Sequence, residues 1–201
     1  PDWSRGLGDV YKRQTMYKFI LRLFGWKINP EIPKEYDRCV LIGAPHTSNW
    51  DFLFSVLSFK ALKIPYKFTI KKQWFRFPFN LIIKPIGGLP IDTKGNSQKG
   101  ISNVDTMASF FSLKEKFVMA ITPEGTRSLK KEWKSGFYHV AKKANVPICL
   151  AYLDYKNKIA GVGKVIFPTD NMAADMKVIM DFYKEIVAKF PHNFSTDLRY
   201  S

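Results

Sequence analysis

The sequence predicts an α/β fold: a single layered domain in which helices flank a mostly parallel central sheet. Short apolar runs of strand length, over residues 38–43, 66–70, 117–122 and 148–153, alternate with segments in which apolar residues recur at helical spacing. Strands that alternate with helices are typical of parallel sheets, because a parallel pair needs a crossover connection. At 201 residues the chain is long enough to bury one core.

In its first half, the chain is expected to form a helix over residues 16–26, a strand over 38–43, a helix over 51–62, a strand over 66–70, a partly helical stretch over 73–84 and a short strand over 89–91. Gly43 and Pro45 end the first strand, and residues 47–49 are of types that cap a helix N-terminus. Pro78 and Pro85 interrupt the partly helical stretch.

In its second half, the chain is expected to form a helix from about residue 96 to 116, a strand over 117–122, a helix over 136–145, a strand over 148–153, an edge strand over 158–167 and a helix over 173–190. Asn96 or Ser97 is the expected cap of the first of these helices. Helically spaced apolar residues such as Met176, Met180 and Tyr183 predict the last one.

The chain is strongly basic, with 32 Lys and Arg against 17 acidic residues and a net charge of +15. Such a charge attracts nucleic acid, anionic lipid or an acidic carrier protein. The basic residues are dispersed and form no nucleic-acid-binding motif, so nucleic acid is not an expected partner. Cys39 and Cys149 lie in strand-like runs and are expected to be buried free thiols; with three His in the chain, they predict no metal site.

The N-terminus divides into two segments. Residues 1–14 are Gly-rich and charged, without periodicity, and are expected to be a disordered leader foreign to the domain of residues 15–201. Residues 15–27 combine aromatic with basic residues, as does an interfacial helix on an anionic membrane; a helix packed on the domain is the alternative. With no run of 18 apolar residues, we expect a cytoplasmic protein, peripheral on the inner face of the cell membrane.

The run His-Thr-Ser-Asn-Trp-Asp, residues 46–51, joins a base to a nearby carboxylate. Neutral imidazole can take a proton from a hydroxyl at neutral pH, and a carboxylate on its other nitrogen fixes the tautomer and stabilises the imidazolium. A turn between His46 and Asp51 would bring the two side chains together, because a spacing of five misaligns them on a straight helix. His46 and Asp51 are therefore the candidate catalytic residues.

A second run, residues 123–128, contains Glu124, Gly125, Thr126 and Arg127. The guanidinium is a planar fork of donors suited to a phosphate, and glycine permits a close backbone approach. The carboxylate would orient Arg127 or the loop; a salt bridge between Glu124 and Arg127 is the alternative role of the arginine. The two runs together indicate activation of an alcohol on a phosphate-bearing substrate.

Four segments, in order, resemble the glycerolipid acyltransferase family, typified by 1-acylglycerol-3-phosphate acyltransferase. The segments are the His-four residues-Asp motif at 46–51, a Gly-rich segment at 87–92, the Glu-Gly-Thr-Arg motif at 124–127 and Val-Pro-Ile at 146–148. They cover roughly residues 36 to 155. One position departs from the pattern, because Thr93 stands where the family usually has Arg.

The resemblance implies a glycerol-3-phosphate acyltransferase-like fold and an O-acyltransferase without a cofactor. The enzyme would move a fatty acyl group from acyl-CoA or acyl-carrier protein to the hydroxyl of a lysophospholipid at an anionic membrane surface. His46, oriented by Asp51, would deprotonate the hydroxyl, and no acyl-enzyme would form. Residues 124–127 and Gly88 would contact substrate. Lys71 is a further candidate ligand, with a solvated lysine as the alternative.

Two alternatives remain at this point. Thr93 removes one expected phosphate ligand, so a lyso-aminolipid, or another lysolipid without a phosphate, is the alternative acceptor. A non-catalytic basic module that binds membrane or nucleic acid is the alternative from another class. It accounts for the net charge of +15 but not for the four ordered segments.

Overall fold

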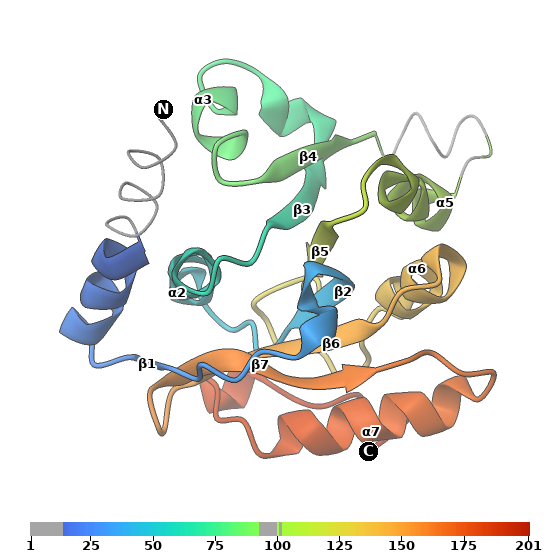
Figure 1. The fold of residues 1–201 in the computed structure, drawn as a ribbon. Helices are drawn as coiled ribbons and strands as arrows, with labels where there is room; N and C mark the ends of the chain where they lie inside the picture. The colour runs from blue at the N-terminus through green and yellow to red at the C-terminus, as the bar shows by residue number, and fades with distance from the viewer. Residues whose placement is uncertain (1–13, 93–99, 101) are drawn as a thin grey trace.

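In a computed structural model, which describes residues 14–92, 100 and 102–201, one mixed, mostly parallel sheet is flanked by helices (Figure 1). The strand order in the described part of the chain is β1-β7-β6-β2-β5-β3-β4. The strands are β1 Lys27–Ile28, β2 Arg38–Gly43, β3 Tyr66–Lys71, β4 Gly88–Ile91, β5 Phe117–Ile121, β6 Ile148–Asp154 and β7 Ile159–Ile166. Five neighbouring pairs are parallel, and β6 with β7 is antiparallel. The predicted α/β fold is confirmed.

The helices lie on both faces of the sheet. They are a helix over residues 14–23, α2 Asn49–Ala61, α3 Asn80–Ile83, α5 Asn103–Ser109, α6 Gly136–Ala144 and α7 Met172–Lys184. Short 3-10 turns cover Lys34–Asp37, Lys72–Phe75, Phe110–Leu113 and Pro191–Asn193. Asn145 at φ 50° ends α6 in the left-handed conformation, a common helix stop.

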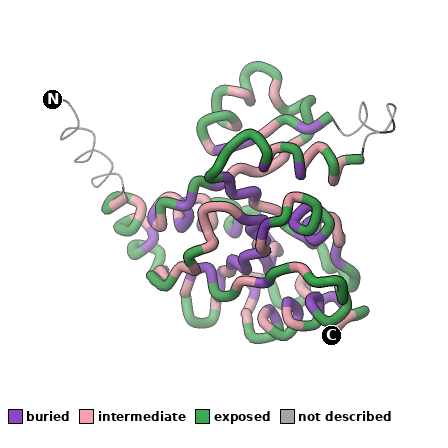
Figure 2. Tube along the Cα trace, turned by 45° about the vertical axis from the view of Figure 1, so that its right-hand side comes forward, coloured by how far each residue is buried: buried purple, intermediate pink, exposed green. Residues whose placement is uncertain are grey.

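The buried residues gather in the interior of the molecule (Figure 2), and along each strand successive side chains enter opposite faces of the sheet. In β2, Val40 and Ile42 face a core formed with α6 and α7, whereas Cys39 and Leu41 face the opposite core beneath α2. Burial on both faces explains why this strand is an unbroken apolar run. Cys39 and Cys149 are free and buried, as expected.

Three expected elements differ in the structure. The strand at 159–166 is not at an edge, because the unpredicted two-residue β1 pairs with its outer side. Helix α7 ends at Lys184, since the chain then crosses to the β6–β7 turn, where the Val187 carbonyl accepts the Tyr155 N–H at 2.9 Å. The helix expected from residue 96 is α5 plus a 3-10 turn ending at Leu113; its expected caps, Asn96 and Ser97, lie outside the described residues.

The N-terminal helix is partly packed and partly exposed. Leu21 and the following Trp26 are fully buried against α2 and β7, and Gln14 Nε2 donates to the Ala61 carbonyl at 2.8 Å. Phe19 and Leu23 face solvent. Residues 1–13 of the expected leader lie outside the described residues, whereas Gln14 belongs to the helix. Among the described helices, none has both the length and the apolar character needed to cross a bilayer.

Candidate active site

The candidate residues gather at one edge of the sheet. His46 follows the carboxyl end of β2, and Glu124 follows the carboxyl end of β5. Because β2 and β5 are parallel neighbours, their carboxyl ends lie side by side. This edge is where open parallel sheets usually bind ligands.

A single carboxylate organises the His46 loop. Asp51 lies in the first turn of α2, where its Oδ2 accepts the backbone N–H groups of Thr47 at 2.7 Å and Ser48 at 2.8 Å. Its Oδ1 accepts the Ser48 hydroxyl at 3.0 Å. Asp51 is thus the acidic member of a capping box at the start of α2, where the helix N-terminus favours a negative charge.

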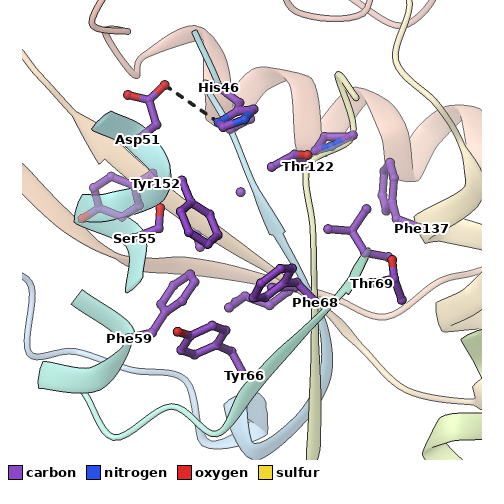
Figure 3. Close-up of a pocket in the computed structure, with 18 of the residues that line it drawn as sticks. His46, Asp51, Ser55, Phe59, Tyr66, Phe68, Thr69, Thr122, Phe137 and Tyr152 are labelled. Carbon is purple, nitrogen blue, oxygen red and sulfur yellow. Dashed lines mark ion pairs between the residues drawn. The ribbon is translucent and has the colours of Figure 1, made fainter. Parts of the chain in front are cut away.

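The turn brings His46 and Asp51 together, with the imidazole Nδ1 3.9 Å from the Asp51 Oδ2 (Figure 3). The two side chains are 12% and 3% exposed. The separation exceeds a hydrogen bond, but it is within ion-pair range once the imidazole is protonated. The other ring nitrogen, Nε2, is therefore the one available to a substrate hydroxyl.

The surroundings keep the imidazole neutral. Burial lowers the pKa of His46 below its ordinary value of 6.5, and this effect outweighs the opposing attraction of Asp51. The positive charge of Arg127 lowers the pKa further. Neutral imidazole is the form that can accept a proton, so the site suits general-base catalysis.

Glu124 serves the histidine loop and not the arginine. Its buried carboxylate accepts the backbone N–H of His46 at 2.7 Å, and no ion pair joins it to Arg127 in the part of the chain that the structure describes. Burial raises the pKa of Glu124 to about 7, against the lowering effect of the His46 N–H, and the nearby Asp51 raises it further. Of the two roles considered for this carboxylate, the contacts favour orientation of the loop.

The other residues of the Glu-Gly-Thr-Arg motif lie toward solvent. Gly125 adopts φ +69° and lines the cavity beside His46. An added Cβ there would lie 2.9 Å from the Lys134 ammonium, which is the end of a flexible side chain and can move aside, so the positive φ is the main reason for a glycine. Thr126 accepts the Ser128 N–H through its hydroxyl at 3.4 Å, and Arg127 is exposed.

Two further candidates lie apart from the cavity lining. Lys71 ends β3 at the same sheet edge as His46 and is exposed. Gly88 is buried in β4, where an added Cβ would meet Ile83 at 2.4 Å and Phe75 at 3.4 Å, so its small size serves packing. Thr93 lies outside the described residues.

An apolar cavity of about 500 Å³ extends from His46 between α2 and the sheet (Figure 3). Its lining includes Phe52, Val56 and Phe59 from α2 and Tyr66 and Phe68 from β3. In Figure 3, His46 lies at one end of the group, with Phe59 and Tyr66 at the other. The base thus meets a space suited to an alkyl chain, since burying methylenes there is favourable.

Sequence reasoning missed two residues of this site. The Tyr155 hydroxyl donates to Asp51 Oδ1 at 2.6 Å, and it comes directly after β6, the other parallel neighbour of β2. Its position just after a predicted strand was the available signal. Lys134 lines the cavity near Gly125 and adds a second cation on that side; its backbone N–H donates to the Pro123 carbonyl at 2.9 Å. Nothing in its local sequence distinguishes it from the neighbouring lysines.

Comparison with known proteins identifies the family of this chain and a structure of similar fold. A family model described as "Acyltransferase" matches residues 27–153. The structure of the 1-acyl-sn-glycerophosphate (LPA) acyltransferase PlsC from Thermotoga maritima is similar, with a TM-score of 0.58 and 15% sequence identity over 90% of this chain and 80% of that chain. Comparison with curated protein sequences finds no significant match. Since the family model spans more than half of the chain and both motif loops, the chain belongs to the acyltransferase family.

Proposed function

We propose that this acyltransferase moves a fatty acyl group from an acyl thioester, acyl-CoA or acyl-carrier protein, to the hydroxyl of a lysophospholipid such as 1-acylglycerol-3-phosphate. The observation that carries the proposal is the neutral, partly buried His46 at one end of an apolar cavity. A general base needs a hydroxyl to deprotonate, and the apolar cavity supplies the affinity for an acyl chain.

In the proposed reaction, His46 Nε2 accepts the proton of the acceptor hydroxyl while its oxygen bonds to the thioester carbonyl carbon. Asp51 stabilises the imidazolium that results. Collapse of the tetrahedral intermediate breaks the carbon–sulfur bond, and the proton on His46 passes to the leaving thiolate. The products are an ester and a free thiol, and His46 returns to its neutral form.

The acceptor's phosphate is assigned to the cationic side of the site. Lys134 lines the cavity and Arg127 is close enough to lower the pKa of His46. Both side chains are exposed, so an anionic head group can reach them from solvent. Lys71, at the end of β3, is a further proposed ligand on the same sheet edge. These cationic side chains favour a phosphate-bearing acceptor over a lyso-aminolipid.

The N-terminal helix supports a peripheral position on an anionic membrane. Met16, Phe19 and Leu23 of this helix, and Phe24 directly after it, are between 47% and 69% exposed, and the basic residues Lys18 and Arg22 lie on the same helix. An apolar face between basic residues is typical of interfacial helices. The helix thus combines the packed face of one sequence-based alternative with the exposed face of the other.

The test is a thiol-release assay with acyl-CoA and acyl-carrier protein as donors and a panel of lysolipids as acceptors. We expect thiol release that depends on a monoacyl phospholipid acceptor and on His46. Release that is independent of any acceptor would indicate a hydrolase, and the absence of release with every donor and acceptor would contradict the proposal. A preference for an acceptor without phosphate would support the lyso-aminolipid alternative.

A further inference from the structure

The segment over residues 72–86, which joins β3 to β4, presents large apolar side chains to solvent. It contains the 3-10 turn Lys72–Phe75 and the helix α3, and it forms the upper part of the molecule in Figure 1. Its most exposed apolar residues are 46% to 79% exposed: Trp74, Phe77, Phe79, Leu81 and Ile82. Five such residues in one short segment form an exposed apolar patch, and patches of this kind typically mark an interaction site.

These apolar side chains are exposed even though the segment itself packs against the domain. Phe75 and Ile83 point inward, where they pack against Gly88 of β4. On the outer side, the rings of Trp74 and Phe79 contact each other edge to face, with centroids 5.6 Å apart. The segment therefore has one apolar face for the domain and a second apolar face without a partner in the described structure.

Positive charge surrounds the outer face. Lys72, Arg76 and Lys84 are exposed, and the sequence has no acidic residue between Lys72 and Ile91. Only Lys72 has an acidic partner among the described contacts, Asp92 at 3.6 Å. An apolar centre with basic flanks complements an anionic bilayer, in which rings and alkyl groups enter the interface and cations remain with the head groups.

The patch lies at the same edge of the sheet as the candidate active site, where the carboxyl ends of the parallel strands meet. Segment 72–86 follows the carboxyl end of β3, and β3 is parallel to β5, which is parallel to β2. The N-terminal part of α2 adds exposed Trp50, Phe52 and Leu53 at this edge. The ring of Phe52 contacts that of Phe68, and both residues line the cavity.

We propose that segment 72–86 is a membrane-insertion element, separate from the N-terminal helix, that seats its outer apolar face in an anionic lipid surface. The need for such a contact rests on the proposed function, since a lysophospholipid acceptor resides in a bilayer. With the N-terminal helix as the other contact, the enzyme binds the surface at two places and holds the His46 edge toward the lipid. The lipid surface is favoured over an acidic carrier protein because the outermost side chains are apolar.

The first experiment places an environment-sensitive fluorophore on the segment. Cys39 and Cys149 are buried, so an Ile82→Cys variant can be labelled selectively with a nitrobenzoxadiazole probe. Leu113→Cys is the matched control; Leu113 is 75% exposed and precedes the amino end of β5, at the opposite sheet edge. With vesicles of phosphatidylcholine and phosphatidylglycerol, the probe at residue 82 is expected to shift to the blue and brighten, and that at 113 to remain unchanged. An unchanged probe at residue 82 overturns the proposal.

The second experiment measures vesicle sedimentation of Leu81→Ser/Ile82→Ser against Leu113→Ser/Phe167→Ser, which removes equally exposed apolar groups from the opposite edge. We expect the first variant to bind about tenfold more weakly than the second, because each methylene withdrawn from the interface weakens partition. Equal binding by the two variants overturns the proposal. So does unchanged vesicle binding together with a raised KM for acyl-carrier protein, which would identify a protein-docking surface.

Thiol release from a soluble short-chain substrate separates this proposal from the proposed function. Leu81→Ser/Ile82→Ser is expected to turn over that substrate like the wild type, since neither residue lines the cavity. A wild type without activity would remove the proposed function, while the vesicle results would still decide whether segment 72–86 enters lipid.

Discussion

The loop over residues 46–51 and the loop over residues 124–127 differ in how their charged groups are held. In the first, Asp51 is buried and accepts four hydrogen bonds. In the second, Glu124 is buried beneath His46 whereas Arg127 is exposed. Two residues of one contiguous motif therefore serve different purposes: Glu124 holds the His46 loop, whereas Arg127 faces solvent, where the proposed function has it meet the substrate.

The largest effect is expected from His46→Ala. Loss of a general base typically lowers the rate about 10²- to 10⁴-fold. Thiol release should fall by that factor while the thermal unfolding curve is retained, because His46 belongs to none of the hydrophobic core clusters among the described residues. His139→Ala, at an exposed position on α6, is the control and should leave the rate unchanged. A folded His46→Ala protein with near-wild-type release would end the assignment.

Glu124→Gln tests the buried half of the Glu-Gly-Thr-Arg motif through the pH dependence of protein stability. Because burial raises the pKa of Glu124 from 4.5 to about 7, the native state binds more protons than the unfolded chain between these values, and stability decreases as pH rises through them. The amide can still accept the His46 N–H without the cost of ionisation. Urea unfolding should give the wild type and the Glu124→Gln variant similar free energies of unfolding at about pH 5. At about pH 8 the variant should be more stable than the wild type by about 3 kcal/mol. A difference that does not change with pH would contradict the buried carboxylate.

Arg127→Ala is expected to act on the acceptor. A charge-assisted hydrogen bond at an exposed site should change the acceptor KM by about tenfold, with little change in the donor KM. Lys130→Ala, an exposed neighbour on the same loop, controls for the general loss of positive charge. Equal changes in both KM values would argue against a head-group contact.

Tyr155→Phe removes the hydroxyl that donates to Asp51 and has the smallest expected effect. Asp51 loses one donor and keeps Thr47 and Ser48, so kcat should fall about three- to tenfold. KM should remain unchanged, since Tyr155 contacts the Asp51 carboxylate and does not line the cavity. With one donor fewer, the Asp51 charge should attract the imidazolium more strongly, so the acid limb of the pH profile should move slightly upward. A change in KM alone would indicate a different role.

The sequence was sufficient for most of the fold and for the residues that act through local chemistry. Apolar runs with clear ends located the main strands, and the proximity of His46 and Asp51 followed from a predicted turn. Contacts between distant segments were not accessible in this way. The Tyr155–Asp51 hydrogen bond spans 104 residues and depends on the strand order, and β1 is too short to show a pattern. Helix α7 ends before its apolar repeat does, because tertiary packing directs the next residues elsewhere.

The pH dependence of kcat/KM in the Glu124→Gln background is the decisive measurement for His46 as the general base. Glu124 titrates near neutrality, so its removal leaves His46 as the group that controls the acid limb. If neutral His46 is the base, kcat/KM should be constant around neutral pH and should decrease only at lower pH, as the buried imidazole gains its proton with a pKa below 6.5. An acid limb that vanishes with Glu124, or an inflection above 6.5, would contradict a neutral His46 acting as the general base.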